Sequence, residues 1–583
     1  MSFRFVPSPP QIYKNMIGTS FLDLIAIRTS ITLLRAITPL SILYTLSLPF
    51  LPSSLFTPTA RLLSLYPICE SAFYLLVYLP RKRHLQAAAQ HPPPPPAHAR
   101  RALFSKVVET INDYEGYLAR WFLGADRNEV KVENIREFVR WSFFNESGCV
   151  SAGQPGKVTS TSTPRLESGG WDEEVEGEVC EYVRLMEEAM GRKFEEGRGS
   201  AECFRLTVDS VEMKHRPLIW YFILSAIDAV TFARLSLAGY TYRRRRPLTA
   251  LLTSFPFRIL ETLSSRSASP SPTLAYWYRP HRNPAKQPIL YIHGIGIGMH
   301  PYVPMLAALA AEAPDVGIIV LELDAISSRI CAAMPTRVEL TSAIYAILAH
   351  HNYIPHAATT TYGTSSTNSD GHGFVLAANS YGTVVTTHLL HTPHVARYVS
   401  TVVLIDPVTL LLHLPAVAYN FLRRKPRRAN EHMLHYYAST DPGVAHTLCR
   451  RFFWAENVLW LEDLFTVPAA PPSSTRNSNS YNDSMTAGAR QAVVYLGERD
   501  LIVDTWSVWQ YLTNTDTTVG GDGDGDGGEV TVTDDEWVRR YPTGSSLKVI
   551  WCEGVDHAQV FDEERWYARI VQDLVAASGR SRG

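Results

Sequence analysis

The sequence contains few cysteines, and its charges leave almost no excess of either sign. Seven cysteines are scattered among 583 residues, and no two of them form a CxxC pair. This pattern argues against a disulfide framework and a cysteine-rich zinc site, and it favours a reducing compartment. Lys and Arg number 55 against 56 for Asp and Glu, so the net charge of −1 provides no general attraction to nucleic acid.

Charge is also nearly absent from two apolar segments close to the N-terminus. Ala36 to Phe56 is 21 residues long without a charge, and Leu62 to Leu79 has only Glu70 in 18 residues. About 20 helical residues cross the roughly 30 Å hydrocarbon core of a bilayer. The basic run 81–83 follows at once, as is typical of the cytosolic side of a membrane. We therefore predict membrane-associated segments in residues 1–90. Two buried core helices remain the alternative, because prolines interrupt both segments.

A third apolar stretch, Pro217 to Tyr240, includes Asp228 and Arg234 and is followed by four arginines, 243–246. If the first two segments form a hairpin with a cytosolic base, a third crossing would place these arginines on the opposite side, against the positive-inside tendency. We therefore predict an interfacial helix, or one packed on the soluble domain, with a true crossing as the rival. The surrounding region, 91–265, is predicted to be mostly helical with linkers.

The remainder, 266–583, alternates short apolar runs with segments of helix length. Continuous β-branched runs separated by helices predict an α/β domain whose mainly parallel sheet is covered on both faces. The segment at about 410–490, between two predicted strands, is far longer than a usual connection, and we predict that this insertion forms a cap over the site. Its aromatic residues, such as Phe452 and Trp454, suit an acyl-chain pocket. The predicted strands are contained in residues 289–294, 316–324, 374–380, 399–407, 492–500 and 547–557.

Four of these runs end in polar residues that suit acyl transfer. Ser380 lies in Asn379–Gly382, where a strand turns sharply into a helix and lifts the hydroxyl clear of the backbone. The glycines of His293–Gly298 let backbone amides turn toward an oxyanion. Asp500 and His557 follow two later runs. Imidazole can take the serine proton, and a carboxylate can orient the imidazole, so these groups predict nucleophilic catalysis.

With the order Ser380, Asp500, His557 and the His293-Gly294 turn upstream, the chain resembles the α/β-hydrolase superfamily in its lipase and esterase-like branch. The resemblance covers about residues 270–575, and together with the apolar first half it is similar to uncharacterised fungal membrane-associated members. It implies that Ser380 is the nucleophile, Asp500 the acid and His557 the base. It also implies that the backbone amides of Ile295 and Tyr381 stabilise the oxyanion.

Two features depart from the family pattern or leave a choice open. Ala378 stands where the serine turn of the family begins with glycine, although Gly382 is in place. The acid remains open among Asp500, Asp406 and Asp504, because Asp406 also follows a strand and Asp504 is close by. The triad chemistry requires no cofactor, and we expect no metal site.

We therefore expect a membrane-associated serine hydrolase that cleaves an ester or thioester of a hydrophobic acyl compound. Its partners would be this acyl ester or lipid and the membrane, and the hydrolase domain would face the cytosol at the endoplasmic reticulum or a lipid droplet. An acyltransferase or thioesterase would use the same triad and is one alternative. A catalytically silent membrane scaffold that uses the hydrolase fold is the other.

Overall fold

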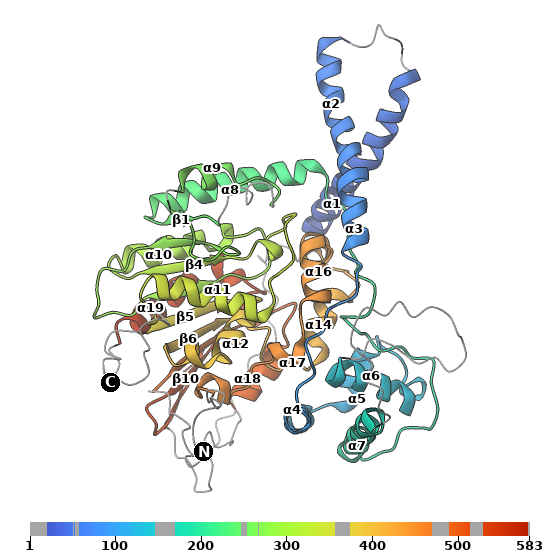
Figure 1. Ribbon diagram of the computed structural model, residues 1–583, viewed down its shortest axis with the longest axis vertical. Coiled ribbons are helices and arrows are strands. Elements are labelled where there is room, and N and C mark those ends of the chain that lie inside the picture. The colour runs from blue at the N-terminus through green and yellow to red at the C-terminus, as the bar shows by residue number, and fades with distance from the viewer. Residues whose placement is uncertain are drawn as a thin grey trace.

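The computed structural model describes the chain in ten stretches and contains an α/β domain, a helical region beside it and a projecting helical hairpin (Figure 1). The α/β class and the mainly parallel sheet predicted from the sequence are confirmed. The described residues are 20–50, 52, 57–145, 170–245, 254–265, 267–355, 373–468, 489–513, 529–533 and 535–580.

One sheet forms the centre of the α/β domain, with the strand order β1-β2-β4-β3-β5-β6-β7-β10-β9-β8. The six predicted runs form its parallel part, and the antiparallel strands β1, β2, β8 and β9 complete its two edges. Because β1 precedes residue 266, the sheet begins earlier in the chain than the predicted domain boundary. The strands are β1 (Thr241–Arg243), β2 (Ala275–Arg279), β3 (Ile289–Ile292), β4 (Ile318–Glu322), β5 (Phe374–Asn379), β6 (Val399–Ile405), β7 (Gln491–Gly497), β8 (Glu529–Val532), β9 (Glu536–Arg540) and β10 (Ser546–Cys552).

Helices cover both faces of this sheet, and the side chains of each central strand alternate between two cores. Leu290 and Ile292 of β3 pack into one core, whereas Ile289 and Tyr291 pack into the other. This period of two explains why the central strands are continuous apolar runs in the sequence. The first core includes α11 (Arg337–His350), α12 (Gly382–Leu390) and α18 (Thr505–Thr513), and the second includes α10 (Val303–Glu312) and α19 (Glu564–Ser578).

The helical region packs against the α/β domain and shares its first core. Aromatic residues such as Phe104, Trp121 and Phe138 belong to the same buried cluster as the strand residues Leu376 and Leu404. Between this region and the sheet lie the helices that follow β6 (Figure 1). The helices of the region are α4 (Ala97–Thr110), α5 (Tyr114–Trp121), α6 (Val132–Phe144) and α7 (Gly170–Met190), and those after β6 are α14 (Pro415–Leu422), α15 (Ala429–Met433), α16 (Pro442–Arg450) and α17 (Trp454–Asn457). Residues 469–488 of the predicted cap lie outside the described residues.

A hairpin of α1 (Phe21–Ser47) and α2 (Pro58–Phe73) projects beyond the rest of the chain (Figure 1). α2 continues through a π-helical turn, Tyr74–Tyr78, into α3 (Leu79–His84). Most leucines of the hairpin are exposed, for example Leu43 at 66% and Leu62 at 72%. Three segments are long and apolar enough to cross a membrane: Phe21–Phe50, Pro58–His84 and α8 (Leu218–Leu237).

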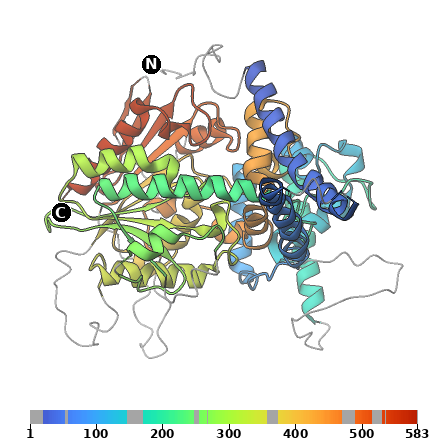
Figure 2. The ribbon, with the colours of Figure 1, turned by 90° about the horizontal axis from the view of Figure 1, so that it is seen from above.

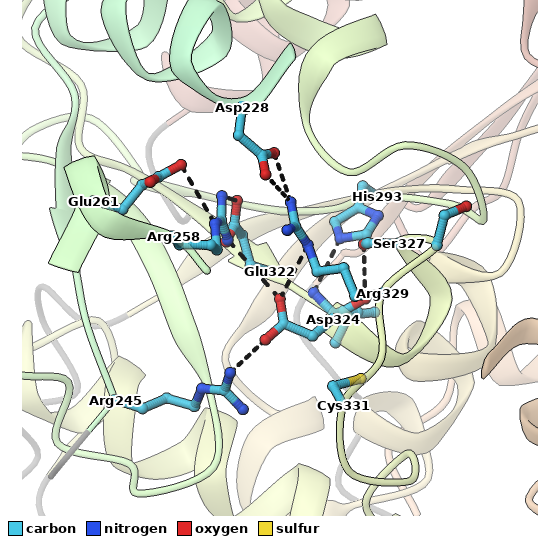
Figure 3. A network of polar contacts seen from close by, with 12 residues as sticks. Asp228, Arg245, Arg258, Glu261, His293, Glu322, Asp324, Ser327, Arg329 and Cys331 are labelled. Atoms are coloured by element: carbon cyan, nitrogen blue, oxygen red, sulfur yellow. Dashed lines mark hydrogen bonds and ion pairs between the residues drawn. The ribbon is translucent and has the colours of Figure 1, made fainter. Parts of the chain in front are cut away.

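α8, the third apolar segment, does not project with the hairpin. It runs across the direction of α2 in Figure 1, and Figure 2 shows it lying at full length along the α/β domain. The Asp228 carboxylate accepts two hydrogen bonds of 2.5 and 2.7 Å from Arg329 of the domain (Figure 3). Leu235 is fully buried in the second core. α8 is therefore packed along the α/β domain.

Candidate functional site

Ser380 lies in a tight turn between β5 and α12. Its φ of +51° is a left-handed conformation that non-glycine residues seldom adopt, so the turn is strained. The Ser380 amide donates to the Ile405 carbonyl of β6 at 2.9 Å, which fixes the turn to the neighbouring strand. Gly382 begins α12 so close to β3 that an added Cβ would lie 2.4 Å from the Ile292 oxygen. The sharp strand-to-helix turn predicted from Asn379–Gly382 is therefore present.

The structure brings the hydroxyl of Ser380 to His557 and His557 to Asp500. Ser380 Oγ lies 2.8 Å from Nε2 of His557, and His557 Nδ1 lies 2.6 Å from Asp500 Oδ2. Asp500 Oδ1 also accepts from the amides of Ile502 and Val503, and its side chain is fully buried. These bonds hold the carboxylate rigidly, so it can orient the imidazole whose other nitrogen faces the serine.

The surroundings of His557 favour its protonated form. Burial opposes the charge, but the nearby carboxylates outweigh it and raise the pKa of His557 to about 9, with Asp500 as the largest contributor and Asp406 and Asp556 adding to it. A raised pKa makes imidazole a stronger proton acceptor, although a smaller fraction is neutral at pH 7.

The two other candidate acids do not bond to His557. Asp406 follows β6 and is fully buried, and its two oxygens accept from the amides of Gly497, at 3.0 Å, and Ala558, at 2.8 Å. Burial, together with the charge of Asp500, raises the pKa of Asp406 to about 7. Asp504 instead binds the amide and hydroxyl of Ser507 at the start of α18. Of the three, Asp500 is the residue placed against the imidazole.

Asp406, Asp500 and His557 are also close enough for one cation, because an oxygen or nitrogen from each lies within 4.8 Å of the others. Their hydrogen bonds already use these atoms. Nδ1 of His557 bonds to Asp500, and both oxygens of Asp406 accept from backbone amides. The contacts within the protein therefore account for this cluster without an ion.

The predicted glycine turn at Gly294 is held against the serine turn. Tyr302 bridges the two turns: its hydroxyl accepts from the Gly294 amide at 3.0 Å and donates to Asn379 Oδ1 at 2.9 Å. A Cβ at Gly294 would lie 2.8 Å from the Ser380 Cβ, so the approach requires glycine. The role of Tyr302 could not be predicted from the sequence, because a lone tyrosine before a helix has no distinctive pattern.

His293 supports the same turn from the inside of the domain and does not reach Ser380. Its Nδ1 lies 2.7 Å from the Gly294 oxygen, and its Nε2 accepts from the Leu323 amide at 3.0 Å. Burial lowers the pKa of His293 to about 4, so the ring is neutral at pH 7. Figure 3 shows it beside the buried ion pairs that join Asp324, Arg329 and Asp228.

The amides proposed to stabilise an oxyanion flank Ser380. Tyr381 immediately precedes α12, where the helix dipole favours negative charge, and Ile295 follows the Gly294 turn. Among the described residues, neither the Tyr381 amide nor the Ile295 amide has a hydrogen-bond acceptor. Ile295 and Tyr381 line the same cavity as Ser380.

An apolar cavity of about 240 Å³ opens from Ser380. The expected cap residues Phe452 and Trp454 line it, together with Phe421 of α14. The opposite wall comes from the helical region, a contribution that sequence analysis missed because this region had no recognisable relation to the hydrolase pattern. The lining residues of that wall include Tyr117, Trp121, Phe138, Trp141 and Ser142.

No protein-family model matches the sequence, and no curated protein matches it either. Solved structures resemble the fold. A bacterial membrane phospholipase A is 12% identical, with 62% of this chain and 94% of that chain covered and a TM-score of 0.34. An esterase from Rhodococcus sp. is 15% identical (53% and 96% covered, TM-score 0.30). A carboxylesterase from Bacillus subtilis is 10% identical (61% and 97% covered, TM-score 0.29). With TM-scores below 0.5, these resemblances add nothing to the geometry around Ser380.

Proposed function

We propose that the chain is a membrane-associated serine hydrolase that cleaves an ester or thioester of a hydrophobic acyl compound. The observation that carries this proposal is the continuous contact from Ser380 through His557 to Asp500, placed at an apolar cavity. A serine hydroxyl and an imidazole are often in contact without any catalytic role. A strained serine turn together with a buried, oriented carboxylate behind the imidazole destabilises the fold, and catalysis accounts for its presence.

In the proposed reaction, Ser380 Oγ attacks the acyl carbonyl while His557 Nε2 accepts the hydroxyl proton. The oxyanion of the tetrahedral intermediate accepts hydrogen bonds from the amides of Ile295 and Tyr381. His557 then protonates the leaving alcohol or thiol, and an acyl-enzyme remains on Ser380. Water, deprotonated by His557, attacks this ester, and the acid product leaves as the serine regains its proton. Asp500 stabilises the imidazolium in both halves of the cycle.

The cavity supports a hydrophobic acyl group. Its walls are mainly aromatic and aliphatic, and its volume of about 240 Å³ is slightly below the roughly 300–1,000 Å³ usual for ligand pockets. A short or medium acyl chain would bury most of its surface there. The helical region forms one wall, so it would take part in substrate selection as well as in folding.

The projecting hairpin supports membrane association, and its charges suggest an orientation. Arg81, Lys82 and Arg83 follow the second apolar helix and lie at the base of the hairpin, on the side of the hydrolase domain. Positively charged residues at such positions favour the cytosolic side. We therefore propose that the hydrolase domain faces the cytosol, on the endoplasmic reticulum or a lipid droplet.

Covalent labelling by a fluorophosphonate in detergent tests the proposed chemistry, because this probe reacts with activated serines. We expect the intact chain to be labelled and Ser380→Ala to be unlabelled. Ser142→Ala is a matched control: Ser142 lines the same cavity, but its hydroxyl bonds only to the carbonyls of its own helix. Labelling that survives in Ser380→Ala, or its absence from the folded intact chain, would contradict the proposal.

A further inference from the structure

We propose that α8 and the short helix α9 (Ile259–Ser264) form a platform that lies flat in the headgroup region of a phospholipid leaflet, and that the α1–α2 hairpin enters this one leaflet without crossing the bilayer. This inference rests on the membrane association within the proposed function and is independent of the serine chemistry.

α8 exposes five large apolar side chains, which is unusual for a helix in water. Of its two charged residues, Asp228 faces the protein and pairs with Arg329, whereas Arg234 in the last turn is exposed. Thr231 lies 3.0 Å from His300. Apart from Arg234 and Ser236 near its C-terminal end, its exposed face is apolar and includes five large side chains. A helix on a water-exposed surface normally presents polar residues outward, so this face requires an apolar or interfacial environment. The five large apolar residues are Ile219, Phe222, Ile223, Val230 and Leu237.

α9 extends the same surface. It lies beside α8 at the end of the molecule from which the hairpin projects (Figure 1). Its one carboxylate, Glu261, is buried and paired with Arg258, whereas its apolar residues are exposed, up to 79% at Leu263. The two helices therefore form a single apolar platform. Because this platform adjoins a hairpin with exposed leucines, a lipid surface can cover both at once.

Positive charge surrounds the base of the hairpin and favours a lipid leaflet over a protein partner. Arg28 and Arg35 on α1 and Lys82 and Arg83 on α3 are exposed. Residues 1–100 contain nine Lys or Arg against only two acidic residues. Basic side chains beside an inserted apolar segment suit anionic lipid headgroups.

The length of the hairpin beyond the platform sets how deeply it enters. Glu70 of α2 accepts from Thr38 of α1 at 2.6 Å and from the Leu218 amide at the start of α8 at 2.7 Å, so these contacts mark the level of the platform. From there the first helix of the hairpin and the 3-10 turn that follows it continue for twelve residues, 39–50, or about 18 Å at 1.5 Å per residue. This is less than the roughly 30 Å of a hydrocarbon core.

The one charge in the inserted part, Arg61, lies nine residues from Glu70 and would be within the hydrocarbon. A buried arginine is unfavourable there, so Arg61→Leu should strengthen insertion. If the hairpin crossed the bilayer instead, Arg61 would reach the opposite headgroups, and its loss would weaken insertion. Extraction of the full chain from vesicles by increasing salt or carbonate measures which of the two occurs.

Fluorescent labelling of single cysteines measures the position of the platform directly. An environment-sensitive dye is attached at Leu237→Cys and Leu263→Cys on the platform and at Phe50→Cys near the hairpin tip. Val338→Cys on α11 is the matched control, since Val338 is an equally exposed aliphatic residue (73%) that lies away from the platform. The background replaces the native cysteines 69, 149 and 180 with serine.

The full chain is then bound to phosphatidylcholine–phosphatidylserine vesicles. We expect a blue shift and a loss of quenching by aqueous iodide at Leu237 and Leu263, with no change at Val338. At Phe50 we expect quenching by lipids that bear a quencher at the end of their acyl chains. Platform dyes that remain as water-exposed as the Val338 dye, or reaction of Phe50→Cys with an impermeant reagent enclosed in the vesicles, would overturn the proposal.

The two proposals can fail separately. Fluorophosphonate labelling in detergent measures only the serine chemistry, whereas the dye positions measure only the membrane placement. A chain that labels normally but leaves the platform in water would refute the platform and keep the hydrolase. The reverse result would refute the hydrolase and keep the platform.

Discussion

Asp406 offers a test of how the second buried carboxylate acts on the catalytic base. Its oxygens do not bond to His557, but one of them lies within 4.8 Å of a ring nitrogen of His557 and of an oxygen of Asp500. A unit charge at this distance stabilises imidazolium by about 3.5 kcal/mol at an effective dielectric constant of about 20. That energy corresponds to about 2.5 pKa units. Asp406→Asn should therefore lower the pKa of His557 by about two units.

The sign follows from the role of His557 as a base. With a pKa of about 9, the imidazole is mostly protonated at neutral pH, and the reactive neutral form increases as the pH rises. Labelling of the intact chain should therefore accelerate up to about pH 9. In Asp406→Asn, removal of the negative charge should move this rise to about pH 7, because imidazolium loses one of its stabilising neighbours.

The assay is the second-order rate of fluorophosphonate labelling between pH 5 and pH 10, with a thermal melt at each pH to confirm folding. Asp315→Asn is the control, since Asp315 is a surface carboxylate paired with Lys286 and its charge is screened from the site. The control should keep the rise near pH 9. A rise that stays near pH 9 in a folded Asp406→Asn variant would refute the electrostatic role.

Three further predictions concern the other groups around the serine. Asp500→Asn should reduce the labelling rate by roughly three to four orders of magnitude, because the imidazole loses its orienting carboxylate; a small effect would reassign the acid. Tyr302→Phe leaves the Gly294 amide and Asn379 Oδ1 without their shared partner, at a cost of about 1–3 kcal/mol. Thermal melts should show this loss together with slower labelling, and an unchanged melting temperature would argue against the bridge. Phe421→Ala should enlarge the cavity and shift the preferred substrate of a p-nitrophenyl ester series to longer acyl chains; an unchanged profile would exclude this residue from the acyl pocket.

Much of the α/β domain could be predicted because its signals are local. The central strands are buried on both faces, so each of them is a continuous apolar run in the sequence. Such a run can be recognised without knowing which strands lie beside it. The turn at Ser380 could be found for the same reason, since strand, turn and helix are adjacent in the chain. The antiparallel strands β1, β2, β8 and β9 at the two sides of the sheet were not predicted, because their sequences, TYR, AYWYR, EVTV and EWVRR, are not continuous apolar runs.

For the apolar helices, the sequence predicted their presence better than their placement. Length and composition identified three apolar segments, and each overlaps a long apolar helix, although the first helix begins at Phe21 and not at the predicted Ala36. Whether an apolar helix projects or lies flat depends on what its other face contacts. For α8, the contact between Asp228 and Arg329 joins residues 101 positions apart, so the sequence could suggest its placement only through the charge rule for the flanking arginines.

The sequence by itself determined which residue types stand at the carboxyl ends of the strands, because a strand and the turn after it are encoded together. It favoured Asp500 as the acid but left Asp406 and Asp504 as alternatives, and it contained no sign of Tyr302 or of the aromatic wall from the helical region. Only the tertiary structure decided these points. The choice of Asp500 depends on which carboxylate the loops after β7 and β10 bring to 2.6 Å from Nδ1 of His557, and such a distance arises from packing between segments far apart in the chain.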